Sequence, residues 1–258
     1  MQKILFIIIA LTISFTTTAQ KTKKQKKEES KKRINALIKQ EEEGIIAYQK
    51  QTVFGGKLIN NGYGIFMEIG RAKSLKKAML YQLELSEYKS PKEEKQSNLY
   101  NYSTPFTFGK QNFFYPVKLG VQQQILFGNK SNKNGVTITG NFGGGISMGL
   151  LRPYYVQVGA TGEYIKYDSK DSLIFLNPKK ISGGPGFSRG WSDITVTPGA
   201  YLKTALRFDY GSYNELVSAL EVGLSGDFYS KKIPIMARTS SKQFFFTGYV
   251  AIIFGRRK

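Results

Sequence analysis

The sequence contains no cysteine and no histidine. Without cysteine, the chain has no disulfide, no thiolate metal site and no cysteine to carry a lipid anchor. Without histidine, it has no Ser-His-Asp triad, no Asp-His hydrolytic pair and lacks the commonest zinc ligand. Catalysis would have to use a pair of carboxylates, or a serine with a lysine. These absences favour a protein that is not an enzyme and needs no cofactor.

Acidic residues are also scarce, with Asp+Glu 18 against Lys+Arg 38 and a formal net charge of +20. So basic a chain could bind nucleic acid. The N-terminal segment has the pattern of an export signal, which argues against nucleic acid as a partner. We therefore expect no nucleic acid, and expect the partners to be outer-membrane lipid and lipopolysaccharide phosphates. The alternative is that most of the excess is solvated charge in tails and loops.

Long apolar runs are missing after the N-terminal segment. Lys3, the apolar run Ile4 to Phe15 and the small residues Thr17-Thr18-Ala19 have the pattern of a secretory signal peptide, which we place at residues 1–19. That run is too short for a membrane-spanning helix, and no later run is long enough. An exported chain of this kind, if it has long alternating strands, is expected in the bacterial outer membrane.

The sequence does have long strands. Apolar and polar residues alternate from Ile194 to Tyr210 and again from Leu216 to Phe228, on either side of a turn at Gly211-Ser212-Tyr213-Asn214. A period of two indicates strand, because successive strand side chains point to opposite faces. Soluble strands usually have about 5 to 6 residues, whereas a tilted membrane-spanning strand needs about 9 to 11. These runs therefore predict a membrane-spanning hairpin.

The run Val136 to Leu150 indicates which face points outward. One of its faces is apolar, and the other consists of small uncharged residues: Thr137, Thr139, Asn141, Gly143, Gly145, Ser147 and Gly149. A face in contact with bulk water has no reason to be so small, whereas the crowded interior of a narrow barrel does. We therefore expect the apolar face to contact lipid and the small polar face to line the lumen.

Eight strands are expected, at 57–70, 74–87, 113–127, 136–150, 154–164, 194–210, 216–228 and through Phe244 to Phe254. The predicted fold class is all-β, an eight-stranded antiparallel transmembrane β-barrel over residues 51–258. An even strand number lets both termini lie in the periplasm. The connection 166–193 would then be extracellular and the connection 88–110 periplasmic.

Several charged residues fall on the inward faces of these strands and form a candidate lumen network. They are Glu68, Glu84, Lys118, Glu163, Lys203, Arg207, Asp209, Glu221 and Asp227. An eight-stranded barrel is just wide enough to be filled by side chains, so paired charges that plug it are the expected reading. A catalytic carboxylate pair in the lumen, acting on lipid or peptide, is the alternative.

The longest late loop carries candidate contacts to lipid or lipopolysaccharide. These are Lys179, Lys180, Arg189 and Trp191, which offer positive charge and an aromatic anchor. A solvated loop without a ligand is the alternative.

Residues 20–50 are expected to form a basic periplasmic extension. Residues 21–33 are rich in lysine, and a short amphipathic helix follows, with Ile34, Leu37, Ile38, Ile45, Ile46 and Tyr48 as candidate partner-binding residues. The helix could dock beneath the barrel, lie on the membrane surface or bind a partner protein. A solvated tether is the alternative.

Several short stretches, taken together and in order, resemble the small outer-membrane β-barrel proteins of the Bacteroidota type. They are Ser90-Pro91-Lys92-Glu93, Leu150-Leu151-Arg152-Pro153-Tyr154-Tyr155, Gly186-Phe187-Ser188-Arg189-Gly190, Pro198-Gly199-Ala200, Ile233-Pro234-Ile235-Met236-Ala237 and Phe254-Gly255-Arg256-Arg257. The resemblance covers most of the mature chain and implies no established enzymatic activity. Some small barrels of this phylum are accessory subunits of larger outer-membrane machines, such as the β-barrel assembly machinery.

The resemblance therefore implies a structural or accessory subunit whose partners are other outer-membrane proteins of a larger complex. A small outer-membrane barrel enzyme and a lipid- or lipopolysaccharide-binding barrel are the alternatives. A soluble secreted barrel that binds an apolar ligand is a further one.

Overall fold

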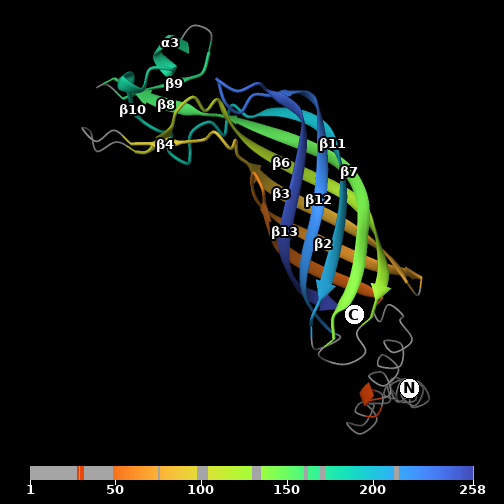
Figure 1. The fold of residues 1–258 in the computed structure, drawn as a ribbon. Coiled ribbons are helices and arrows are strands. Elements are labelled where there is room, and N and C mark those ends of the chain that lie inside the picture. Colours follow the sequence, from red (N-terminus) through yellow and green to blue (C-terminus); the bar gives the residue numbers. More distant parts are fainter. Residues whose placement is uncertain are drawn as a thin grey trace, which may run out of the picture.

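Eight long strands close into one antiparallel barrel in the computed structural model (Figure 1). The structure describes residues 49–74, 76–97, 104–129, 135–159, 162–168, 172–211 and 215–257, together with the single residues 28, 30 and 31. The barrel strands are β1 (Lys50–Ile59), β2 (Gly62–Ser74), β3 (Lys77–Tyr88), β6 (Asn112–Gly128), β7 (Thr137–Pro153), β11 (Thr195–Asp209), β12 (Leu216–Ile233) and β13 (Lys242–Arg257). The predicted all-β, eight-stranded antiparallel barrel is confirmed.

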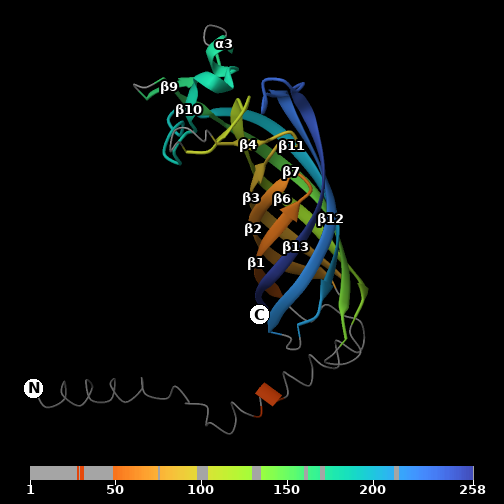
Figure 2. The same cartoon turned by 60° about the vertical axis from the view of Figure 1, so that its left-hand side comes forward.

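The first and last strands pair to close the ring. Strand β1 runs antiparallel to β13, from Gln51 opposite Arg257 to Ile59 opposite Tyr249. Every barrel strand therefore has two hydrogen-bonded neighbours, and the barrel has no unpaired edge. The pairing also brings the first residue of β1 and the last residue of β13 to the same rim, which we call the terminal rim (Figure 2).

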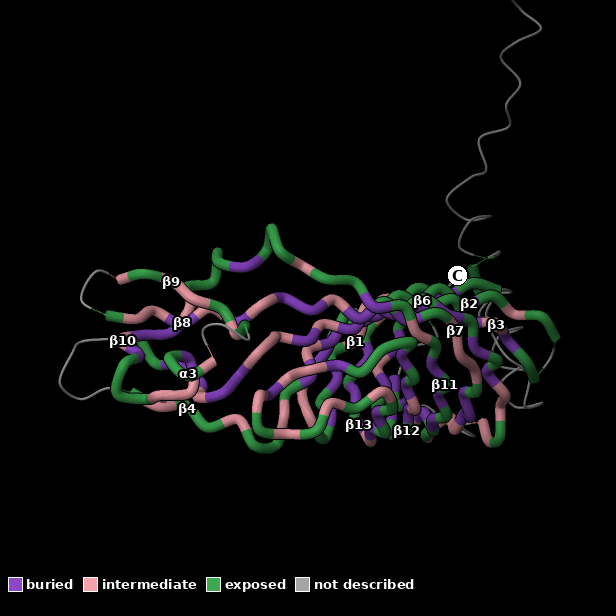
Figure 3. Tube along the Cα trace, turned by 90° about the horizontal axis from the view of Figure 1, so that it is seen from above, coloured by how far each residue is buried: buried purple, intermediate pink, exposed green. Residues whose placement is uncertain are grey.

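The alternation of the sequence explains the two faces of the wall. Along the barrel strands buried and exposed residues alternate (Figure 3), and the buried set points inward. On β11, for example, Lys203, Ala205 and Arg207 are buried whereas Leu202 and Leu206 are exposed. The faces predicted for the runs 113–127, 136–150, 194–210 and 216–228 are those that the structure has.

Two strand predictions were wrong, but together the two errors leave the number of barrel strands unchanged. The run 57–70 is not one strand: β1 ends at Ile59 and β2 begins at Gly62, because Asn60 and Asn61 form a two-residue turn. The run 154–164 is not a barrel strand. It divides into β8 (Tyr155–Val158) and β9 (Glu163–Lys166), which pair with each other outside the barrel.

These short strands belong to a small folded unit beyond the barrel, which we call the head. Its sheet has the order β10-β8-β9, with β10 at Ile181–Gly183, and it also carries α3 (Ser172–Phe175) and the 3-10 helix η1 (Pro178–Lys180). Gly159 and Gly162 have positive φ angles of 68° and 72°, which reverse the chain between β8 and β9. A separate apolar core of Phe106, Tyr154, Val156, Phe175 and Ile181 holds the head together.

The head lies at the rim opposite the terminal rim, which we call the loop rim (Figures 1 and 2). The connection between β3 and β6 lies at this rim too, and it contains the short pair β4 (Lys95–Gln96) and β5 (Phe106–Thr107). The prediction that 88–110 and 166–193 lie on opposite sides was therefore wrong, because the extra strand assigned at 154–164 reversed the parity of the loops.

Three connections interlock at the loop rim. The amide of Gln111 donates to the carbonyl of Ile235 at 2.8 Å, and the amide of Tyr154 donates to the carbonyl of Gln111 at 2.8 Å. Further along, the amide of Gly184 donates to the carbonyl of Thr104 at 3.1 Å. These bonds satisfy loop backbone groups and tie the head to the barrel.

Candidate functional site

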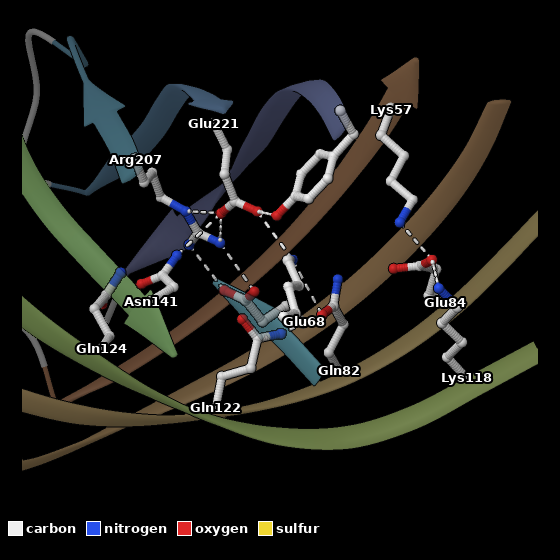
Figure 4. A network of polar contacts seen from close by, with 12 residues as sticks. Lys57, Glu68, Gln82, Glu84, Lys118, Gln122, Gln124, Asn141, Arg207 and Glu221 are labelled. Atoms are coloured by element: carbon white, nitrogen blue, oxygen red, sulfur yellow. Dashed lines mark hydrogen bonds and ion pairs between the residues drawn. The ribbon is translucent and has the colours of Figure 1, made fainter. Parts of the chain in front are cut away.

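The lumen holds a first ion cluster around Arg207 (Figure 4). Its guanidinium donates to both carboxylate oxygens of Glu68 at 2.8 and 2.9 Å, and through Nε to Glu221 at 2.8 Å. Lys203 pairs with Glu221 at 2.9 Å, and the hydroxyl of Tyr249 donates to the same carboxylate at 2.7 Å. The residues come from β2, β11, β12 and β13, so the cluster joins opposite walls of the barrel.

A second cluster is centred on Glu84 and Asp227. Glu84 pairs with Lys57 and lies 3.6 Å from Lys118. The ammonium of Lys118 lies 2.7 Å from the Asp227 carboxylate, to which Tyr88 also donates at 2.6 Å. Gln82, two residues before Glu84 on β3, contacts the first cluster, because its side-chain oxygen accepts from Lys203 at 3.3 Å and also from Gln122.

The two clusters are electrically balanced. Four cations, Lys57, Lys118, Lys203 and Arg207, face four carboxylates, Glu68, Glu84, Glu221 and Asp227. Each of these eight side chains is at most 3% exposed. A buried charge is tolerated when it is paired and hydrogen-bonded, and these conditions are met here. The arrangement fills the lumen with neutral pairs and leaves no carboxylate exposed to a substrate.

Aromatic side chains fill the lumen toward the loop rim. Tyr88 packs edge-on against Phe114 with ring centroids 5.7 Å apart, and Phe114 packs against Tyr229 at 5.2 Å. Phe245 contacts all three rings. Together with the ion clusters, these rings make the barrel interior a packed core.

The structure brings together most of the charged residues that were predicted for the lumen. Those inside the barrel are Glu68, Glu84, Lys118, Lys203, Arg207, Asp209, Glu221 and Asp227. Asp209 takes no part in either cluster and pairs with Arg257 at the terminal rim. The lumen placement of Glu163 was wrong, because this residue is exposed on β9 in the head.

Sequence reasoning missed Lys57. The side chain is 2% exposed and pairs with Glu84. The alternation of the sequence could have placed Lys57 inside, because it lies four residues after the inward Val53, whereas Phe54 and Leu58 point outward. Placing the start of the strand at residue 57 hid this pattern.

A cationic and aromatic cluster lies where the head meets the barrel wall. The guanidinium of Arg152 lies 4.0 Å from the ring centroid of Phe113 and 4.6 Å from that of Trp191, and it donates to the carbonyl of Phe187 at 3.0 Å. Trp191 also stacks on Tyr115, with centroids 5.9 Å apart. Arg152 is only 3% exposed, so these contacts hold the turn after β10 against the wall.

The predicted lipid-contact residues occupy two places. Trp191 and Arg189 belong to the turn near the wall, where the Arg189 guanidinium lies 4.3 Å from the Tyr164 ring. Lys179 and Lys180 are exposed on η1, in the head. The candidate partner-binding residues of the N-terminal extension, Ile34, Leu37, Ile38, Ile45, Ile46 and Tyr48, lie outside the described residues.

The described ranges contain neither a cluster of metal ligands nor a membrane-spanning helix. Within residues 49–257, apart from the gaps given above, no group of three or more Asp or Glu residues is placed to hold a metal ion. None of the helices in this part of the chain is long and apolar enough to cross a membrane.

No protein-family model and no curated protein matches the sequence. Among solved structures, the chain is similar to Neisserial surface protein A, with 10% identity and a TM-score of 0.38 over 81% of this chain and 96% of that one. It is similar to the N-terminal β-barrel domain of Pseudomonas aeruginosa OprF, with 10% identity and a TM-score of 0.37 over 81% and 98%.

A third similar structure is Ail, the attachment invasion locus protein of Yersinia pestis, in complex with the heparin analogue sucrose octasulfate. It has 7% identity and a TM-score of 0.35 over 81% of this chain and 98% of that one. At identities and scores this low, what these proteins bind says nothing about this chain.

Proposed function

We propose that this protein is an integral outer-membrane β-barrel with a sealed lumen and a non-catalytic, structural role. One observation carries the proposal: the polarity of the wall is inverted, with charges inside and large apolar side chains outside. Exposed examples from different parts of the ring are Leu58 at 73%, Leu83 at 52% and Leu202 at 74%. A soluble protein rarely exposes so large an apolar surface, whereas a bilayer requires it.

The length of the strands and the closure of the ring support the same environment. Strands β6 and β7 have 17 residues each, more than the about 9 to 11 that a tilted membrane-spanning strand needs. Because the ring is closed, its backbone groups are hydrogen-bonded within the wall, as a hydrocarbon environment demands. The inverted wall argues against the soluble barrel that was considered as an alternative.

The sealed lumen supports a structural role over a pore or an enzyme. The eight paired charges and the aromatic cluster occupy the space through which a solute would pass. Each carboxylate is held by at least one cation, so none is poised as a free base.

We further propose that the terminal rim faces the periplasm and the head faces outward. The predicted signal peptide and extension precede β1, which begins at the terminal rim. Short periplasmic turns and longer outer loops are usual for such barrels. The extension at 20–50 is the part that would bind a larger outer-membrane complex, and this accessory role stays a prediction. Lipopolysaccharide contacts by Lys179, Lys180, Arg189 and Trp191 stay predictions too.

Membrane extraction and conductance test the proposal. The protein should stay in the membrane pellet through salt and carbonate washes, leave it only with detergent, and migrate differently on a gel before and after boiling. In planar bilayers it should give no steady open channel. Release by carbonate without detergent would contradict the membrane barrel, and a stable conductance would contradict the sealed lumen.

The accessory role is tested by a pull-down from gently solubilised native membrane, using a C-terminal tag. Recovery with a large outer-membrane complex, lost when residues 21–50 are deleted, would support it. Recovery of the barrel alone would contradict it.

A further inference from the structure

The outer wall carries an apolar hollow across four strands. Its sides are formed by Phe142, Leu202, Leu224 and Phe246, and Gly144 and Gly226 lie at its floor. In the strand register, Gly144 and Gly226 are the neighbours of Leu202 on either side, and Gly226 also neighbours Phe246. Two missing side chains beside a leucine thus leave a depression in an otherwise bulky apolar surface.

Two lysines lie above this hollow, toward the loop rim. Lys232 lies near the end of β12, and Lys242 begins β13 as the cross-strand partner of Ile233, the residue that follows Lys232. Both lysines are exposed, and neither pairs with an acidic residue in the part of the chain that the structure describes. Lys231 adds a third exposed cation beside them. The two lysines form a cationic site with unused hydrogen-bond donors.

Exposed phenylalanines connect the lysines to the hollow. Phe228 and Phe244 are cross-strand partners, each 56% exposed, and they lie between Lys232 and Gly226 along the wall. Along β13, Lys242 lies four positions before Phe246, the cross-strand partner of Gly226, which is about 13 Å along a strand and about 10 Å along the normal of a membrane crossed at a tilt of about 40°. That distance is about a third of an apolar thickness of about 30 Å. The hollow therefore lies at acyl-chain depth when the lysines lie at headgroup depth.

We propose that this surface binds one lipopolysaccharide molecule of the outer leaflet, with a phosphate on Lys232 and Lys242 and an acyl chain in the hollow beside Leu202. Cations above an apolar depression are complementary to an anionic amphiphile, since a phosphate accepts hydrogen bonds from ammonium groups while its chains fill apolar space. The choice of lipopolysaccharide rests on the proposed function, which places the loop rim at the outer leaflet. The site differs from the loop residues 179–191, because it lies on the barrel wall at β7, β11, β12 and β13.

Binding of purified lipopolysaccharide to the whole protein in a neutral detergent tests the site. Wild type should bind intact lipopolysaccharide more tightly than the dephosphorylated form or phosphatidylglycerol. The double variant Lys232→Gln/Lys242→Gln should weaken binding on the order of tenfold. Gly226→Leu should weaken it as well by filling the hollow, and the backbone accepts its Cβ, which would meet nothing nearer than 3.5 Å.

Matched controls lie on another part of the wall. Lys50 and Arg71 are an exposed cross-strand pair at the terminal rim, so Lys50→Gln/Arg71→Gln removes equal charge elsewhere. Gly56 is an outward glycine on β1 with open space around it, so Gly56→Leu adds equal bulk elsewhere. Both controls should bind as wild type does.

Several results would overturn the proposal. They are unchanged affinity in the Lys232/Lys242 variant, equal losses in the control pair, and equal binding of dephosphorylated lipopolysaccharide. Equal binding of phosphatidylglycerol would assign the site to a phospholipid instead. Heat-modifiable mobility of each variant reports whether the barrel has folded. If wild type is released from membranes by carbonate, the proposed function fails, and this result is distinct from a failure of the lipid site.

Discussion

Replacing Arg207 with methionine should destabilise the barrel strongly. Glu68 is completely buried, and in the described part of the chain Arg207 is the only cation paired with it. Arg207→Met leaves this carboxylate without a partner, whereas Glu221 keeps Lys203 and the Tyr249 hydroxyl. Removing one partner of a buried pair costs about 3–5 kcal/mol, so the free energy of unfolding should fall by that amount.

A second substitution should recover part of the loss. In Arg207→Met/Glu68→Gln, the orphaned charge is gone and three cations face three carboxylates in the two clusters. This variant should be about 1–3 kcal/mol more stable than Arg207→Met alone. The exposed Arg256 on β13 provides the control, and Arg256→Met should change the free energy of unfolding by less than about 0.5 kcal/mol.

The assay is a urea titration of the protein in phospholipid vesicles, followed by the fluorescence of Trp191, the single tryptophan. The boiled and unboiled gel mobilities give an independent reading of the folded fraction. If Arg207→Met and Arg256→Met unfold at the same urea concentration, the lumen clusters do not stabilise the barrel and the reasoning is refuted.

Three further predictions concern the wall and the head. Leu202→Arg, near the middle of β11, should lower stability in vesicles by about 2–4 kcal/mol, while the same change at exposed Leu173 on α3 in the head should have little effect; equal effects would contradict the membrane placement. Arg152→Met should release the turn that holds Trp191, seen as red-shifted fluorescence with unchanged heat-modifiable mobility, and an unchanged spectrum would contradict this role of Arg152. Burial raises the pKa of the Tyr154 phenol above its ordinary value of 10, so the unfolded chain ionises first, and the head should lose stability as the pH rises above about 10. Compared with Tyr154→Phe, wild type should therefore show the steeper alkaline loss of near-ultraviolet circular dichroism, and equal slopes would contradict it.

The architecture could be predicted because the wall has a period of two. In runs such as 113–127 and 194–210, one face is apolar and the other small or charged, so only one assignment of inside and outside is possible. The same alternation gave a wrong prediction at 154–164, because a short strand in the head alternates between apolar and polar residues as a long strand of the wall does. Its turn depends on Gly159 and Gly162, whose positive φ angles are visible only in the structure.

The partners within the lumen could not be read from the sequence. Parity places Arg207 and Glu68 inside, but their contact joins residues on different walls and depends on how the strands are ordered and staggered around the ring. The same is true of Arg152. Nothing in the run Leu150 to Tyr155 shows that its guanidinium packs between Phe113 and Trp191, which come from a neighbouring strand and a distant turn.

Single-cysteine spin labelling tests the inverted wall most directly. Because the sequence contains no cysteine, each variant carries a label at one position only. Labels would be placed at Leu83→Cys, Leu119→Cys and Leu202→Cys on the exposed apolar wall, and at Leu173→Cys on α3 in the head. In vesicles, the three wall labels should be accessible to oxygen and protected from a water-soluble nickel chelate, and the head label should be accessible to the chelate. Access of the nickel chelate to all three wall labels would show that the wall faces water, and would contradict a membrane-spanning barrel.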